Sequence, residues 1–184
     1  MPIRDDYTAS QWMTVQQAPI LAGLYVAISG DRPNSVEVYE EAKGILKAMT
    51  NDPPQTARNA LTTALTEDTK NGAAPPEPAL VTDNKTITAE QARAQALQGV
   101  LDAVAVVARV SPGEVQGFRY YLYNIAEVTA RAGEKGGIFG LGGHAASADE
   151  PMLTSLAQSL GVTVAPQSPP QSPPTQSPPP SAPH

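Results

Sequence analysis

The chain has 184 residues, enough for one domain of ordinary size with an additional tail. Its formal net charge of −6 argues against a nucleic-acid-binding surface, because such surfaces need clustered lysine and arginine to displace counterions from phosphate. The absence of cysteine excludes disulfides, thiolate chemistry and cysteine-based metal sites.

Short helices separated by turn residues are predicted for the first half of the chain. Thr8 or Ser10 begins a short helix, and Pro19 begins a second apolar segment. Gly23 within that segment allows a close approach to a neighbouring element. Asn34 begins a helix that runs to about residue 49, and a further helix follows Asp-Pro-Pro-Gln at 52–55 and ends near residue 70. We expect 71–85, which holds Asn-Gly and three prolines, to be an exposed loop.

A hairpin of two long helices is predicted for residues 88–132. Thr88 and Gln91 have the spacing of a capping box at the start of the first helix. Between Val100 and Val110 this helix is apolar on nearly all sides, which is typical of a helix buried in the middle of a fold. Its apolar residues recur at three- and four-residue steps: Leu97, Val100, Leu101, Val104, Val107 and Ala108.

The second helix of this hairpin is expected to begin at Ser111-Pro112-Gly113-Glu114, with Ser111 as the cap and Glu114 as its box partner. Gly133 ends it, because glycine adopts the left-handed conformation without strain. A connection of one or two residues makes the two helices antiparallel neighbours. The buried face of the second helix is predicted to contain Val115, Phe118, Tyr121, Leu122, Ile125, Val128 and Thr129.

A last helix is capped by residues 147–150 and stopped by Gly161, with Leu153, Leu156, Ala157 and Leu160 on its inner side. The sequence therefore predicts an all-α, single-domain bundle of six to seven helices over 1–161, built around the central antiparallel hairpin. Residues 162–184 are predicted to be a disordered Pro/Ser/Gln-rich tail. The tail is interpreted as a solvated spacer, or alternatively as a docking peptide for an aromatic-lined groove.

A glycine-rich segment, Gly133 to His144, could cradle a phosphate, but it lacks the Gly-Lys-Ser/Thr ending of a Walker loop and follows no strand. We interpret it as an irregular loop that packs Ile138, Phe139 and Leu141 against the bundle or a partner. The alternative is a lid over a small-ligand or enzymatic site. His144 has no evident catalytic partner, so we expect it to be a surface or loop-packing residue.

Two further sets of residues are candidate sites. Arg119, Tyr120 and Tyr123 form an aromatic-rich turn of the kind that is enriched at protein interfaces. The carboxylates that could hold a hard cation are Asp31, Glu37, Glu40 and Glu41, although no calcium-loop spacing is present and a solvated helix face is the alternative.

Residues 21–46 contain an apolar helix ending in Ser29-Gly30-Asp31, followed by a capped acidic helix, and 145–162 has a similar cap, acid and apolar rhythm around Asp149 and Glu150. These two segments resemble the tellurite-resistance TerB-like family, which is all-helical and built of two similar halves. The resemblance covers about a quarter of the chain and matches that family's acidic turns only in part. It implies a stress-linked, non-catalytic module that works near membranes or partner proteins, or a cation-binding stress-response protein.

No group of residues with reaction geometry is found, so the sequence predicts a non-enzymatic interaction or scaffold module with an unidentified protein partner and no cofactor. The N-terminus lacks the basic-then-apolar pattern of a signal peptide, and no apolar run approaches ~18 residues. We therefore expect a cytoplasmic protein without a transmembrane segment.

Overall fold

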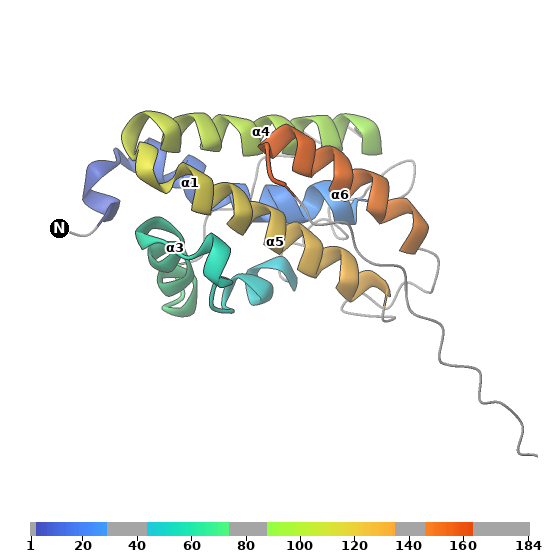
Figure 1. Cartoon of the computed structure of the whole chain (residues 1–184), viewed down its shortest axis with the longest axis horizontal. Helices are drawn as coiled ribbons and strands as arrows, with labels where there is room; N and C mark the ends of the chain where they lie inside the picture. The colour runs from blue at the N-terminus through green and yellow to red at the C-terminus, as the bar shows by residue number, and fades with distance from the viewer. Residues whose placement is uncertain (1–2, 29–43, 74–87, 135–145, 164–184) are drawn as a thin grey trace, which may run out of the picture.

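The computed structural model describes residues 3–28, 44–73, 88–134 and 146–163, and these residues form helices and no strand. The all-α class is thus confirmed for this part of the chain. The elements are η1 (Ile3–Asp6), α1 (Ala9–Ala27), a helical segment at 44–49, η2 (Gln55–Ala57), α3 (Ala60–Lys70), α4 (Ala89–Val110), η4 (Pro112–Glu114), α5 (Val115–Glu134) and α6 (Ala146–Leu160) (Figure 1). No described helix is both long and apolar enough to cross a bilayer.

Helix α1 is the central element of the bundle. Every residue from Ala18 to Val26 is buried, and α1 packs against α4 and α5 more extensively than those two helices pack against each other. The prediction that 88–132 forms the centre is therefore wrong. Ala105 and Ala108 of α4 are exposed. Alanine raises the apolar content of a helix without needing burial, so the apolar pattern of α4 did not indicate a central position.

Helix α1 is also a single helix, where two segments were expected. Thr8 caps it and forms the capping box with Gln11, through hydrogen bonds of 2.9 and 3.3 Å. Pro19 lies inside the helix, so one backbone hydrogen bond is lost there. The burial of residues 20–26, which follow it, offsets that loss. Gly23 makes the expected close approach, since a Cβ at this position would lie 2.6 Å from Ile45 Cδ1.

Helices α4 and α5 are joined by a 3₁₀ turn. Thr88 and Gln91 form the predicted capping box at the start of α4. Ser111, in contrast, makes no side-chain capping bond, so the second predicted box is wrong. Glu114 instead turns towards α3, where its Oε2 accepts a hydrogen bond from the backbone N–H of Leu61 at 3.1 Å. From the turn, α5 diverges from α4 (Figure 1).

A polar clasp, formed by Asn59, Glu114 and Gly117, joins the start of α3 to the start of α5. Asn59 caps α3 through the backbone N–H of Thr62, and its Nδ2 donates to the carbonyl oxygen of Glu114 at 2.8 Å. A Cβ on Gly117 would collide with Asn59 Nδ2 and lie 3.3 Å from the carbonyl oxygen of Ala57. The absence of a side chain at 117 is therefore what allows α3 to dock.

A second attachment ties α3 to α1 through Asp68. Its Oδ2 accepts hydrogen bonds from Trp12 Nε1 at 3.3 Å and from Gln16 Nε2 at 3.1 Å. The guanidinium of Arg4 lies 3.9 Å from the same oxygen and stacks 5.9 Å from the centre of the Trp12 ring. One carboxylate thus holds together residues from three elements.

Helix α6 packs chiefly against α5, with Leu156, Ala157 and Leu160 buried. Gly161, at φ +63°, ends it as predicted. The N–H groups of Gly161 and Val162 donate to the carbonyl oxygens of Gln158 and Ala157, which is a Schellman motif. Val162, the first residue of the predicted tail, is itself buried, so the packed part includes it.

Candidate interaction surface

Several predicted site residues lie outside the described part of the chain. They are the carboxylates Asp31, Glu37, Glu40 and Glu41, the apolar residues Ile138, Phe139 and Leu141, and His144. Within the described ranges, no three His, Asp or Glu residues come together as a metal site would require. The cation site and the role of the glycine-rich segment stay predictions.

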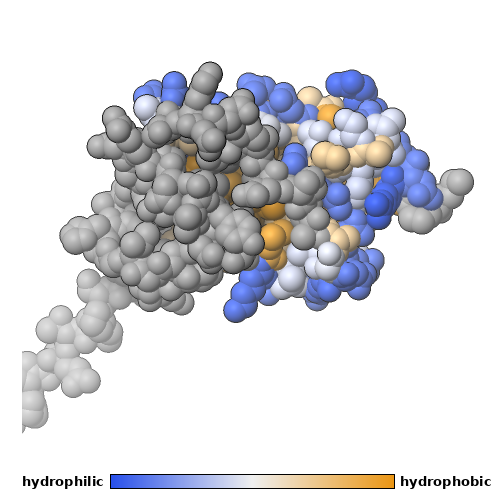
Figure 2. All heavy atoms as spheres, turned by 180° about the vertical axis from the view of Figure 1, so that it is seen from behind, coloured by the Kyte–Doolittle hydropathy of each residue, from blue (hydrophilic) through white to orange (hydrophobic). Residues whose placement is uncertain are grey.

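In the described part of the chain, large hydrophobic side chains do not form a broad exposed patch. Seen from behind, hydrophilic residues form most of the edge of the described surface, and hydrophobic side chains show mainly in its middle (Figure 2). Among the described residues, Met13 is the one large hydrophobic side chain that is exposed, at 47%. A candidate surface has to be sought among half-buried aromatic and polar side chains.

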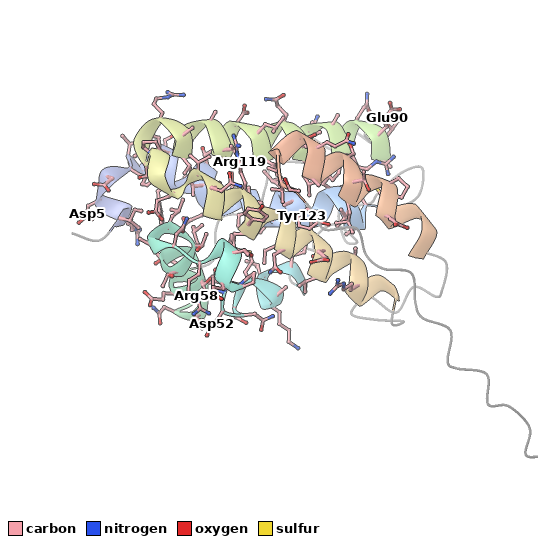
Figure 3. The ribbon with its side chains drawn as sticks, viewed as in Figure 1. Asp5, Asp52, Arg58, Glu90, Arg119 and Tyr123 are labelled. Carbon is pink, nitrogen blue, oxygen red and sulfur yellow. The ribbon has the colours of Figure 1, made fainter. Side chains whose placement is uncertain are left out.

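The predicted trio of Arg119, Tyr120 and Tyr123 lies together on α5, and we refer to it as the α5 tyrosine surface. All three side chains are half-buried, whereas Phe118 and Leu122 on the opposite side of the helix are fully buried. Three- and four-residue spacing makes these side chains neighbours on one helix face. Figure 3 shows Arg119 and Tyr123 on α5, with Arg119 close to the end of α6.

Arg119 is the unusual member of this surface. Its Nε is buried without a hydrogen-bond partner, and it makes no ion pair with any described residue. Its Nη1 lies 3.6 Å from the position that a Cβ on Gly161 would occupy, so the guanidinium sits beside the last turn of α6. A cation is favoured there by the partial negative charge of a helix C-terminus. That interaction stabilises the charge but leaves the Nε–H without an acceptor.

The Tyr123 hydroxyl holds its proton more tightly than a free phenol, because its pKa is raised. Burial raises the pKa of Tyr123, the nearby Glu127 carboxylate raises it further, and Arg131 offsets part of the rise. Glu127 and Arg131 are themselves paired at 2.8 Å, one helix turn apart. Tyr120 packs its ring against the core. The surface therefore presents two aromatic rings and several hydrogen-bond donors.

Sequence reasoning missed a second tyrosine environment, between α5 and α3. Tyr121 is buried as predicted, and its hydroxyl lies beside that of Thr66, also buried, without a well-formed hydrogen bond for either. Burial raises the pKa of Tyr121, and the neighbouring Thr66 hydroxyl offsets this only in part. With 1% of Tyr121 exposed, this pair has no access to a substrate and is part of the core. Only the docking of α3, far away in the sequence, brings the two hydroxyls together.

The α5 tyrosine surface thus brings together a guanidinium and two phenols, and the Glu127 carboxylate lies near Tyr123. In comparisons with known proteins, no family model matches the chain, and no curated protein or solved structure shows significant similarity to it.

Proposed function

We propose that the protein is a non-enzymatic helical interaction module of the cytoplasm, and that its α5 tyrosine surface binds a protein partner. The observation that supports this most directly is the half-buried Arg119 guanidinium, which forms no ion pair with any described residue. Hydrogen bonds between a guanidinium and a carboxylate are roughly twice as strong as those between neutral groups. A partner that supplies a carboxylate or carbonyl oxygen to the Nη groups of Arg119 gains such bonds on binding.

The two tyrosines beside Arg119 favour the same function. Tyrosine and arginine are enriched at protein interfaces and among the residues that dominate binding energy. Tyr120 and Tyr123 are already half-buried against the core, so little side-chain freedom is lost when a partner covers them. A rigid aromatic pair next to an unsatisfied cation is a compact recognition surface.

Photo-crosslinking in the native host tests this proposal. A benzophenone amino acid replaces Tyr123 in one chain and Ala105, an exposed residue of α4, in the control chain. We expect a discrete protein adduct from position 123 that weakens strongly in the Arg119→Gln background, and no such adduct from position 105. Far-UV circular dichroism checks that each chain is folded. The same adducts from both positions, or none from position 123, contradict the proposal.

A further inference from the structure

The segment that follows the last helix starts beside the α5 tyrosine surface. Helix α6 ends at Leu160, and its Schellman motif fixes the direction of Gly161 and Val162. Gly161 is next to the Arg119 guanidinium, and Figure 1 shows the end of α6 above the first half of α5. Residues 164–184 therefore begin within a few residues of the surface proposed to bind a partner.

The composition of 164–184 gives it more hydrogen-bond acceptors than donors, because prolines make up a large part of it. Three Gln-Ser-Pro-Pro repeats begin at Gln167, Gln171 and Gln176, and no lysine, arginine, aspartate or glutamate occurs in the segment. Each proline lacks a backbone N–H but keeps its carbonyl. Such sequences favour the polyproline II conformation, which has no internal hydrogen bonds to satisfy those carbonyls. Recognition of this segment must therefore use donors and ring contacts, not charge pairing.

The α5 tyrosine surface has the complementary chemistry. A guanidinium carries five N–H donors and no acceptor, and that of Arg119 is half-buried and forms no ion pair with any described residue. The hydroxyls of Tyr120 and Tyr123 are further donors. Polyproline segments bind grooves lined by aromatic rings, where the rings pack on the pyrrolidines and donors meet the carbonyls. The chain therefore contains both a proline-rich segment and a surface with the aromatic rings and donors that bind such segments.

We propose that residues 164–184 dock on the α5 tyrosine surface of their own chain and compete there with the external partner. This inference rests on the proposed function, because it assigns the segment to the same surface. A polyproline II segment rises ~3.1 Å per residue, and Arg119 and Tyr123 are separated by about one turn of α5, roughly 6 Å. A few residues of 164–184 are therefore long enough to contact both side chains. A tether this short gives an effective concentration in the millimolar range, which favours docking within one chain even when the contact is weak.

Fluorine NMR of the full chain labelled with 3-fluorotyrosine tests the docking. The six tyrosine resonances are assigned by single Tyr→Phe variants, and the full chain is compared with a chain that ends at Ala165, which retains α6 and its cap. We expect the resonances of Tyr120 and Tyr123 to move on truncation. They should return when a synthetic 164–184 peptide is added at millimolar concentration, while Tyr25, buried in α1, keeps its resonance.

A control of full length separates the role of the prolines from that of chain length. Replacing prolines 169, 170, 173 and 174 by alanine should move the Tyr120 and Tyr123 resonances to their positions in the truncated chain. Identical resonances in the full and truncated chains overturn the docking. A photo-adduct between two copies of the chain, formed from position 123 of the full-length protein, also overturns it, because the segment would then bind a neighbour.

The photo-crosslinking assay distinguishes the failure of this inference from the failure of the proposed function. If the segment competes, the truncated chain gives more external adduct at position 123 than the full chain. Equal adduct from both chains refutes the competition and leaves the proposed function standing. Fluorine shifts on truncation without any external adduct support the docking and refute the proposed function.

Discussion

The clasp of Asn59, Glu114 and Gly117 leads to a prediction that reverses the usual effect of replacing glycine in a helix. In an exposed helix, Gly→Ala stabilises by about 1 kcal/mol. In Gly117→Ala the new methyl group collides with the Asn59 side chain. That side chain caps α3 and donates to the carbonyl oxygen of Glu114, and both interactions should be lost.

The expected size follows from the groups displaced. Loss of an Asn cap costs about 0.5–2 kcal/mol, and loss of the hydrogen bond to Glu114 costs about 1 kcal/mol. After subtraction of the helix-propensity gain, Gly117→Ala should lower the free energy of unfolding by about 0.5–2 kcal/mol. For a chain of this size that corresponds to a fall in Tm of roughly 2–4 °C per kcal/mol. Urea unfolding followed by circular dichroism measures the change.

The matched control is Gly113→Ala, because no atom lies within 4 Å of a Cβ built at this position. We expect its free energy of unfolding to stay within about 0.5 kcal/mol of the wild type. In an Asn59→Ala background the main collision is removed, so the cost of Gly117→Ala should largely disappear. The reasoning is refuted if Gly117→Ala is as stable as the wild type, or if its cost is unchanged when Asn59 is absent.

Three other substitutions test other parts of the structure. Asp68→Ala should destabilise by about 1–3 kcal/mol, because it removes the acceptor of the Trp12 and Gln16 side chains, and Trp12 fluorescence during urea unfolding reports it. Leu156→Ala should cost about 2–5 kcal/mol by opening a cavity under α6, measured as a lower urea midpoint. Above about pH 10 the free energy of unfolding should fall, because the buried Tyr121 phenol keeps its proton in the folded state while the unfolded chain releases it. Unfolding curves at pH 8 and above pH 10 measure this fall. The Tyr121→Phe variant should reduce it.

Each of these predictions has a control on the same element. Glu67→Ala and Thr154→Ala change exposed residues of α3 and α6, and a cost comparable with Asp68→Ala or Leu156→Ala would contradict the assigned roles. Tyr7 and Tyr123 also have raised pKa values, so Tyr121→Phe should remove only part of the alkaline loss. An alkaline profile unchanged in Tyr121→Phe would show that this phenol does not contribute.

Some helix ends were predictable because capping is local. Thr88 and Gly161 act within four or five residues of themselves and have their predicted roles, and of the two predicted starts of α1, Thr8 and Ser10, the structure has Thr8 as the cap. Two other predicted ends are wrong, because Ser111 makes no side-chain capping bond and Gly133 lies inside α5. The centre of the bundle was not predictable in the same way. The apolar content of α4 comes largely from alanines, several of which are exposed, whereas α1 looks interrupted at Pro19 although it is continuous.

The sequence predicted which residues form the candidate surface, but it did not predict the burial of their polar atoms. Helical spacing alone places Arg119, Tyr120 and Tyr123 on one face. The burial of the Arg119 Nε depends on the packed arrangement of α5 and α6, which no pattern within α5 reveals. The partner of Glu114 is similarly hidden, because α3 precedes it by some fifty residues.

The central position of α1 has a consequence for synthesis on the ribosome. This helix ends at Ala27, but the helices that bury it, α4 and α5, begin only at Ala89 and Val115. A nascent chain must therefore carry its most apolar segment without its final neighbours while most of the domain is still being translated. Such delayed pairing slows folding relative to bundles with local contacts and exposes the emerging polypeptide to aggregation, so α1 is the segment that a molecular chaperone has most reason to shield.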